Sequence, residues 1–365
     1  MEIRRIKKSE WNKILEFNKK EYNPRHILCN KNYYDWQFDD VFNSDTENYT
    51  SLGLFDKQDN LVGTVGAFPA PCSFLGEAVS CHWVANLMIE KRLRNLGYGY
   101  LLLDGVTEGV DVAVDHDIND AAWALFVKSG WRGADIKRYI GVYNIGVAER
   151  IVGRANLGLK ILPEPFSDFG AGWNFEKVGR LGAEVDEFWN EIKEKYPISI
   201  ERSSKYLNWR FSGNSLVDYH IFLTRRDNQV TAMAVLRIEV ITEGRTKRET
   251  GIKIGRLVDF ISTDEAENYT LLKSVEFCRR QGVALIDFFC TGSYGRESLT
   301  RAGFVDSETY PYSLIPTLLN PIDRIKRTKH NFAFKIINKF YKNADSENLE
   351  NWYTVKSCGD QDRPY

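Results

Sequence analysis

A short run near residue 95 has the residue types and spacing of a diphosphate-binding loop. Arg94, Asn95, Leu96, Gly97, Tyr98 and Gly99 form an R-x-x-G-x-G motif. An apolar run, 84–89, precedes the motif, and apolar residues at helical spacing follow it, so the motif lies where a strand turns into a helix. At such a turn, free backbone N–H groups and the positive end of the helix dipole bind phosphate oxygens.

Two other phosphate loops do not fit this run. The dinucleotide fingerprint needs a third glycine, where this chain has Leu102, and the nucleoside-triphosphate loop needs a Gly-Lys-Ser/Thr sequence that is absent. Taken alone, two glycines between a strand and a helix also fit a plain connector.

A second motif extends from residue 119 to residue 131 and matches the pattern N-x-x-A-x-x-L-[YF]-x-x-x-G-[FW]. Together the two motifs resemble the GCN5-related N-acetyltransferase (GNAT) superfamily. The resemblance implies that the first motif binds the diphosphate of acyl-CoA and that the second follows the pantetheine arm. The acyl-CoA contacts it implies are Leu87, Ile89, Arg94, Asn95, Leu96, Gly97, Tyr98, Gly99, Asn119 and Phe126.

Composition limits the classes of function. The chain has 365 residues, of which 43% are hydrophobic and 13% aromatic, which is enough for two packed cores. Its formal net charge of −1 argues against nucleic acid as the main partner and against a polybasic membrane anchor. The six cysteines show no C-x-x-C pair and no zinc-ligand spacing with the five histidines, so we expect reduced thiols and no metal.

The sequence also gives no sign of export or membrane insertion. The N-terminus runs directly into charged residues, and no apolar stretch of spanning length occurs. We therefore expect a cytoplasmic protein without a membrane partner.

Parts of the chain repeat at one offset. The segments 33–38 and 206–211, 84–87 and 257–260, and 129–131 and 302–304 match in pairs separated by 173 residues, and an Asp-Asn turn signal recurs in both halves. The repeat predicts a mixed α/β fold of two GNAT-like domains in tandem. Each domain would have a central mixed sheet, with a splayed strand pair, flanked by helices.

The expected domain boundaries follow from the repeat and from composition. The first domain, with the acyl-CoA site, would cover residues 1–150, and a connector rich in Gly, Pro and Phe would cover 151–184. The second domain would cover 185–320. Residues 321–365 would form a C-terminal helix, at about 329–342, and a strand at 352–355.

The second domain lacks the glycine loop. Its matching segment, 262–268, contains three carboxylates, which would repel a diphosphate. The sequence therefore predicts one acyl-CoA site per chain, with the second domain free to shape the acceptor pocket.

Candidate catalytic residues lie in the strand before the loop. Alternation along this strand would place His82 and Asn86 on one face, where His82 can accept a proton near neutral pH and Asn86 can orient an amine. Both could instead only satisfy backbone groups in the core. Many family members have a tyrosine acid where this chain has Phe126, so a side-chain acid–base pair is in doubt. Asp115-His116-Asp117 is a second source of a base.

The tandem arrangement resembles GNAT-type nucleotide-sugar N-acyltransferases of bacterial surface-polysaccharide (O-antigen, capsule, lipopolysaccharide) synthesis. These acylate dTDP-linked amino sugars such as dTDP-3-amino-3,6-dideoxy-galactose, with acyl groups such as 3-hydroxybutanoyl. The resemblance implies an amine acceptor on a nucleotide-linked sugar. The candidate acceptor residues are Trp36, for stacking or for the core, Arg202 and Arg210, for phosphates, and Asp360, for sugar hydroxyls.

Two other functions stay open. A FemABX-like aminoacyl transferase also has two GNAT-like domains, but the near-zero net charge and the intact loop count against a tRNA-bound donor. A non-catalytic CoA-binding protein is compatible with the missing tyrosine.

Overall fold

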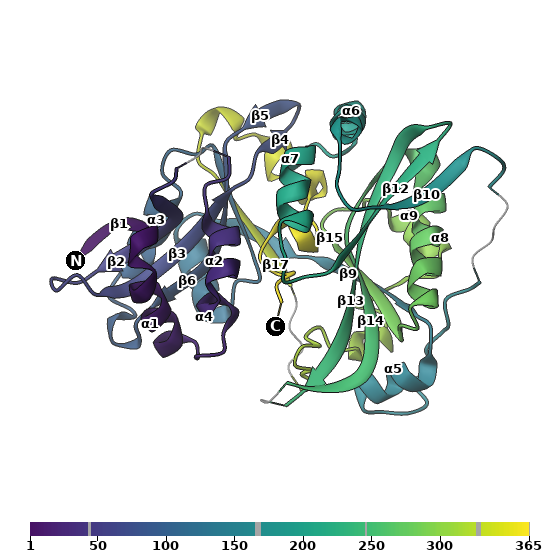
Figure 1. The fold of residues 1–365 in the computed structure, drawn as a ribbon, viewed down its shortest axis with the longest axis horizontal. Coiled ribbons are helices and arrows are strands. Elements are labelled where there is room, and N and C mark those ends of the chain that lie inside the picture. The colour runs from purple at the N-terminus through teal and green to yellow at the C-terminus, as the bar shows by residue number, and fades with distance from the viewer. Residues whose placement is uncertain (43–44, 165–168, 245–246, 326–329, 365) are drawn as a thin grey trace.

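The computed structural model describes residues 1–42, 45–164, 169–244, 247–325 and 330–364, which form a mixed α/β fold around two large sheets (Figure 1). In this view the sheet that contains the N-terminus lies at the left and the other large sheet at the right. The C-terminal segment, in yellow, runs between them. The prediction of a mixed α/β architecture with two sheets flanked by helices is confirmed.

Seven strands form the first sheet, in the order β1-β2-β3-β6-β7-β17-β8. Their bounds are β1 Glu2–Lys7, β2 Asn48–Phe55, β3 Leu61–Pro69, β6 Cys81–Ile89, β7 Val112–His116, β17 Asn331–Ile336 and β8 Arg132–Asp135. All neighbours are antiparallel except β6 and β7, which are parallel.

The second sheet repeats this plan, in the order β10-β12-β13-β14-β15-β9-β16. Its strands are β10 Trp173–Val178, β12 Tyr219–Arg226, β13 Gln229–Glu243, β14 Arg248–Ser262, β15 Leu285–Cys290, β9 Lys137–Val142 and β16 Val305–Asp306. Here too one pair, β14 and β15, is parallel. A smaller sheet joins β18 Trp352–Tyr353, β11 Ile198–Ile200, β4 Cys72–Phe74 and β5 Glu77–Val79.

Helices cover the sheets. The α-helices are α1 Trp11–Glu21, α2 Lys31–Phe38, α3 Tyr98–Val106, α4 Asp120–Lys128, α5 Ile145–Val152, α6 Ala183–Ile192, α7 Ser204–Leu207, α8 Asp264–Arg280, α9 Arg296–Arg301 and α10 Ala344–Glu347. A π-helical turn, η5 Asn208–Ser212, continues α7. The 3-10 helices are η1 Lys8–Glu10, η2 Ile27–Cys29, η3 Lys91–Leu93, η4 Lys193–Lys195, η6 Tyr312–Leu314, η7 Lys339–Tyr341, η8 Leu349–Asn351 and η9 Lys356–Cys358.

The internal repeat is visible in reciprocal contacts between its copies. The indole Nε1 of Trp36 donates to the backbone oxygen of Trp209 at 2.9 Å, and Nε1 of Trp209 donates to the backbone oxygen of Trp36 at 3.0 Å. The two rings stack with their centroids 5.5 Å apart. Two residues separated by 173 positions thus exchange equal hydrogen bonds, as expected at an axis that relates the two halves.

The two sheets exchange a strand. β9, from the N-terminal half of the sequence, lies in the second sheet between β15 and β16, and β17, from the C-terminal part, lies in the first sheet between β7 and β8. Each half therefore contributes one strand to the other. The expected boundary at residue 150 does not coincide with a boundary between the sheets, because β9 at residues 137–142 belongs to the second sheet.

The expected helix at about 329–342 is wrong. Residue 329 lies outside the described residues, and Asn331–Ile336 form the strand β17, followed by the 3-10 helix η7. Helical spacing of Phe332 and Ile336 also fits alternating strand positions, and pairing with β7 and β8 decides for the strand. The expected strand at 352–355 is present as β18, although it covers only Trp352 and Tyr353.

The largest core is shared by both halves. It joins Trp83 of the first sheet, Leu257 and Phe288 of the second sheet, and Trp352 and Tyr353 of the C-terminal segment. The C-terminal segment is therefore part of the core and positions whatever lies at its end. Among the described residues, none of the helices has the length and apolar content needed to span a bilayer.

Candidate active site

The two parallel strands of the first sheet separate at their carboxyl ends. β6 and β7 pair from Cys81 with Val112 to Val84 with Asp115, and beyond this point β6 continues to Ile89 on its β3 side alone. The edge of β6 after Val84 faces a gap. Backbone N–H and C=O groups on such an edge can pair with an extended ligand.

A β-bulge in β6 lies at this point. Thr64 of β3 pairs with Met88 and Gly66 pairs with Ala85, so β6 has one extra residue, and Asn86 has a left-handed φ of 57°. The bulge shifts the alternation of side chains by one residue. Val84 before it and Ile89 after it therefore belong to the same core cluster, although a regular strand would place an even-numbered and an odd-numbered residue on opposite faces. The expectation that His82 and Asn86 share a face is therefore wrong.

His82 lies away from the gap. Its Nδ1 is 2.7 Å from the backbone oxygen of Val106 at the end of α3, and burial lowers the pKa of its imidazole. His82 precedes Asn86 by four strand positions, about 13 Å at roughly 3.3 Å per residue. The structure does not bring it to the cavity described below and gives its ring a backbone partner, so this arrangement does not support His82 as the base.

The R-x-x-G-x-G loop forms an exposed turn at the end of β6. Gly97 has a φ of 86° and precedes α3 without a side-chain cap, and the first hydrogen bond of the helix runs from the Leu101 N–H to the Gly97 oxygen. The N–H groups before Leu101 thus point out of the helix end. Arg94 is exposed, and its Nε donates to the Ile89 oxygen at 3.0 Å.

The remaining predicted contacts lie around this turn. Asn95 and Leu96 are exposed, Tyr98 begins α3, and Leu87 follows the bulge. Gly99 allows close packing, since a Cβ there would lie 3.1 Å from Leu125 of α4. The loop therefore offers free N–H groups and a guanidinium to a diphosphate, next to the open edge of β6.

The second motif builds α4. The side-chain oxygen of Asn119 accepts from the Ala122 N–H at 3.0 Å and caps the helix, and Phe126 is buried against Trp131 with ring centroids 4.8 Å apart. A cap and a core contact explain these two residue types by structure. Both residues also line the cavity at the gap.

A cavity of about 190 Å³ occupies the gap between β6 and β7. Its walls come from α1, the bulge of β6, the end of β7, α4 and the C-terminal segment. The lining residues are Tyr22, Asn86, Leu87, Met88, Asp115, His116, Asp117, Ile118, Asn119, Ala122, Phe126, Asp360, Gln361 and Arg363.

The C-terminal segment brings a charged pair into this cavity. Arg363 Nη1 lies 3.3 Å from Asp360 Oδ2 and 3.4 Å from Asn86 Oδ1. The structure thus joins two predicted residues, Asn86 and Asp360, although they are far apart in sequence. Burial raises the pKa of the Asp360 carboxyl, and Arg363 opposes this shift.

Two further titratable groups line the cavity at the end of β7. Burial, and then the charge of Asp360, raise the pKa of the Asp115 carboxyl well above its ordinary value. Burial lowers the pKa of His116 to about 3, so its imidazole is neutral at pH 7. A carboxylate with a raised pKa is suited to accept a proton near neutral pH.

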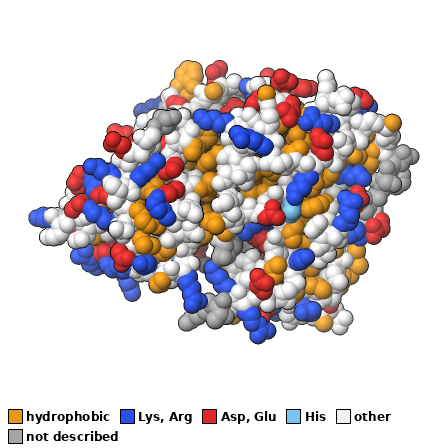
Figure 2. Space-filling view, viewed as in Figure 1, with side chains coloured by type: hydrophobic (Ala, Val, Ile, Leu, Met, Phe, Trp, Pro, Cys, Tyr) orange, Lys and Arg blue, Asp and Glu red, His pale blue; other side chains and the backbone are white. Residues whose placement is uncertain are grey.

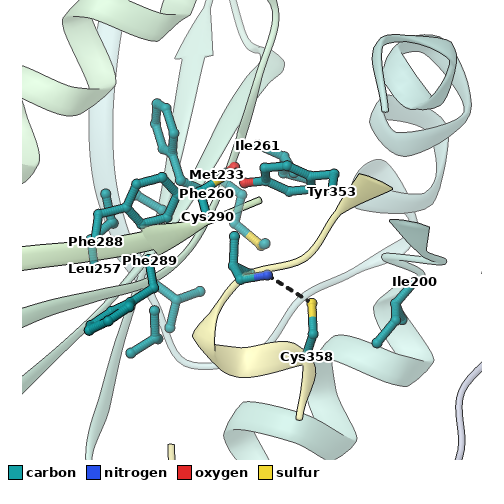
Figure 3. Packing of buried hydrophobic residues seen from close by; sticks show 14 of the residues in the cluster. Ile200, Met233, Leu257, Phe260, Ile261, Phe288, Phe289, Cys290, Tyr353 and Cys358 are labelled. Atoms are coloured by element: carbon teal, nitrogen blue, oxygen red, sulfur yellow. Dashed lines mark hydrogen bonds between the residues drawn. The ribbon is translucent and has the colours of Figure 1, made fainter. Parts of the chain in front are cut away.

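In the second sheet the equivalent gap is filled by the chain itself. β14 and β15 pair only from Gly255 with Ile286 to Leu257 with Phe288, and then Cys290 forms a bridge to Val355 of the C-terminal segment. Figure 3 shows Tyr353 and Cys358 packed beside Phe260 and Cys290, with the Val355 N–H donating to the Cys358 sulfur at 3.4 Å. Ligand access there is blocked by protein.

The N-terminus of α8, which corresponds in the second half to the N-terminus of α3, is occupied by side chains of the protein. Thr263 caps α8 through its side-chain oxygen, and the first turn contains Asp264, Glu265 and Glu267. These carboxylates satisfy the positive end of the helix dipole. Lys195 pairs with Asp264 at 2.6 Å and with Glu267 at 3.0 Å.

Neither arginine predicted to bind phosphates is available. Arg202 is fully buried, donates to Asp259 Oδ1 at 3.1 Å and to the Ile200 oxygen at 3.1 Å, and lies over the ring of Tyr353. Arg210, 2% exposed, donates to the backbone oxygens of Ser357 at 2.6 Å and Gly359 at 2.9 Å. Both anchor the C-terminal segment, so their prediction as phosphate ligands is wrong.

Trp36 is likewise occupied by protein. Its ring stacks on Trp209, and the guanidinium of Arg210 lies 5.1 Å from its centroid. The structure supports the core alternative for Trp36 and places no cavity-lining role on it.

Sequence reasoning missed Tyr22, Gln361 and Arg363. Tyr22 belongs to an amphipathic segment with no motif, so no signal in the sequence could have found it. Gln361 and Arg363 stand next to the predicted residue Asp360, but a single sequence does not show where the C-terminal segment packs. Within the described ranges, no group of three or more His, Cys, Asp or Glu side chains is arranged to hold a metal.

Comparison with known proteins gives structural matches only. No family model and no curated protein matches the sequence. Saccharomyces cerevisiae N-myristoyltransferase with bound myristoyl-CoA matches with a TM-score of 0.57 and 12% identity, over 92% of this chain and 78% of the other. A GCN5-related N-acetyltransferase from Anabaena variabilis matches with a TM-score of 0.57 and 10% identity, over 93% and 74%.

A third structure, a probable N-acyltransferase of unknown function from Enterococcus faecalis, matches with a TM-score of 0.57 and 10% identity, over 92% of this chain and 73% of the other. All three likenesses extend over both sheets, because they cover more than nine-tenths of this chain. The chain therefore shares, over nearly its whole length, the fold of these three structures.

Proposed function

We propose that this protein is an acyl-CoA-dependent N-acyltransferase with one active site per chain. The main observation is the uncapped start of α3 beside the open edge of β6, with a cavity at the gap between β6 and β7. The loop Arg94–Gly99 would bind the diphosphate, and the backbone of Leu87 and Ile89 would pair with the pantetheine arm. The thioester would then lie at the bulge.

Asp360 is the proposed base. The amine nitrogen attacks the thioester carbonyl carbon, the C–N bond forms, and the C–S bond breaks. The proton of the amine passes to the Asp360 carboxylate, and the CoA thiolate leaves and takes a proton from water. A backbone N–H left unpaired at the bulge can donate to the carbonyl oxygen while its negative charge develops.

The chemical class of the acceptor is a further part of the proposal. The resemblance of the sequence suggests a nucleotide-linked amino sugar, such as a dTDP-amino-deoxy sugar, acylated with an acetyl or short hydroxyacyl group such as 3-hydroxybutanoyl. Because Arg202 and Arg210 are buried, a nucleotide diphosphate would have to bind on the outer surface. Positive and negative side chains are interspersed over the face shown in Figure 2, so local arginines and lysines are present there.

Calorimetric titration with acetyl-CoA, together with release of free CoA thiol on addition of amines, tests this function. We expect one acetyl-CoA per chain and thiol release that depends on an amine. Asp360→Asn should lower kcat about 10²- to 10⁴-fold with little change in acetyl-CoA affinity, and should remove the fall in kcat at low pH that the wild type shows as Asp360 is protonated. His82→Ala is the matched control.

Two acetyl-CoA molecules per chain would contradict the single site. Binding without thiol release from any amine would leave a CoA-binding protein. For the acceptor, a free amino sugar is compared with its nucleotide-linked form, and equal kcat/KM for both would exclude the nucleotide-sugar proposal.

A further inference from the structure

The walls of the cavity carry more negative than positive charge. Three carboxylates line it, those of Asp115, Asp117 and Asp360, against one guanidinium, that of Arg363. Arg363 is paired with Asp360, and Asp117 is paired with Nδ1 of His330 outside the lining. Asp115 is 7% exposed, and no ion pair to it is found among the described residues.

Two histidines, one in the lining and one behind Tyr22, do not supply a balancing cation. His116 is neutral at pH 7, because burial lowers its pKa to about 3. His26, whose ring stacks on Tyr22, has its pKa lowered to about 4, first by burial and then by the charges of Arg363 and Lys247. A cation from the ligand would therefore meet one carboxyl without an ion pair, that of Asp115, next to the two paired carboxylates.

A second, independent feature is a buried amide without partners. Gln361 is 5% exposed and lines the cavity, and neither its Nε2 nor its Oε1 has a hydrogen-bond partner among the described residues. Nδ2 of Asn86 and Nδ1 of His116 also lack a hydrogen-bond partner among the described residues. A buried polar atom without a hydrogen-bond partner is destabilising, so a ligand that offers hydroxyl groups can pair with these atoms and an alkyl ligand cannot.

We infer that the cavity binds the acceptor of the proposed reaction as a hydroxylated primary ammonium compound. The ammonium lies among Asp115, Asp117 and Asp360, a hydroxyl group pairs with the Gln361 amide, and any anionic part of the acceptor stays outside. The volume of about 190 Å³ is small for a whole nucleotide sugar, so only the amine-bearing end of a large acceptor is enclosed. This inference rests on the proposed function for the identity of the acceptor.

Equilibrium binding to the full chain saturated with CoA tests the inference without any turnover. The probes are glucosamine, glucosamine 6-phosphate, which adds an anionic group, and cyclohexylamine, which lacks hydroxyl groups. We expect glucosamine to bind at least tenfold more tightly than either of the others. Asp115→Asn should reduce the preference over the phosphate at least fivefold, and Gln361→Leu should reduce the preference over cyclohexylamine by the same factor.

Each variant serves as the control for the other, because Asp115→Asn changes charge and Gln361→Leu changes hydrogen bonding. Glu194→Gln, at an exposed carboxylate of η4 in the other half, should change neither preference. Equal or tighter binding of the phosphate, preferences unchanged in both variants, or no binding of any of the three amines would overturn the inference. Failure of the proposed function is read separately, from acetyl-CoA stoichiometry and thiol release.

Discussion

Asp115 is a buried carboxyl whose surroundings disfavour its charge. Its pKa is raised well above the ordinary value, first by burial and then by Asp360. The folded chain therefore binds a proton at Asp115 more readily than the unfolded chain does, and the free energy of unfolding decreases as the pH rises through the interval between the two pKa values. This carboxylate is destabilising at neutral pH.

Asp115→Asn should therefore raise Tm at pH 8. The gain should disappear at about pH 3, below the unfolded pKa of about 3.9, where Asp115 is protonated in both states. In a chain of this size a change of about 1 kcal/mol in the free energy of unfolding shifts Tm by about 1 °C, so Tm should be measured by scanning calorimetry at both pH values. Asp117→Asn, at a carboxylate paired with His330, is the control and should not raise Tm.

Gly97 is the residue of the loop whose backbone needs glycine. Its φ is 86°, which disfavours any other residue, while a Cβ there would meet no protein atom within 4 Å and would point into the space proposed for the diphosphate. Gly97→Val should weaken acetyl-CoA binding at least tenfold in calorimetry. Gly109→Val is matched, since Gly109 has a φ of 78° and open space but lies outside the loop; equal affinity in the two variants would show that the loop does not bind the ligand.

At the scale of elements, motif spacing correctly predicts the strand, glycine turn and helix around residues 84–106, because those signals are local. The hairpin turns at Asp59 and at Asp227-Asn228 are predicted for the same reason, and all three residues have positive φ. The bulge at Asn86 leaves no signal in one sequence, because it depends on the register with β3. That is why strict alternation wrongly placed His82 and Asn86 on one face of the strand.

The burial of Arg202 and Arg210 and the strand β17 could not be predicted for a different reason. Each depends on contacts between segments that are far apart in sequence. Arg210 meets Gly359 at a separation of 149 residues, and Asn331 meets Ile118 at 213. An arginine that caps backbone oxygens in the core has the same local sequence as one that binds a ligand.

β17 fits into the first sheet because β8 has a glycine opposite it. A Cβ at Gly133 would lie 2.0 Å from the Phe332 backbone oxygen. Gly133→Ala should therefore lower the free energy of unfolding by about 1–3 kcal/mol, measured by urea denaturation. Gly179→Ala is the control, because no atom lies within 4 Å of a Cβ there, and equal stability of the two variants would contradict the packing described.

At the scale of the whole molecule, the exchanged strands join the two halves into one folding unit. A fragment of residues 1–150 would keep β9 without its partners and leave β7 and β8 without β17. We expect this fragment to bind no acetyl-CoA and to aggregate through its open edges. Co-expression with residues 151–365 should restore one site per complex.

A monomeric fragment 1–150 that binds acetyl-CoA with the affinity of the full chain would contradict this prediction. Size-exclusion chromatography and calorimetry distinguish the two results. The comparison also tests the proposed base, because Asp360 and Arg363 reach the cavity of the first sheet only from the C-terminal segment.

The strand exchange has a consequence for synthesis on the ribosome. The antiparallel strand partner of β7 is made 216 residues later, since His116 pairs with Phe332, so at about 5–20 residues per second the nascent chain waits about 10–40 s before its first sheet can close. During this time the edges of β7 and β8 are exposed to other nascent chains. An unfinished N-terminal sheet therefore needs protection while the chain is made, whatever the stability of the finished protein.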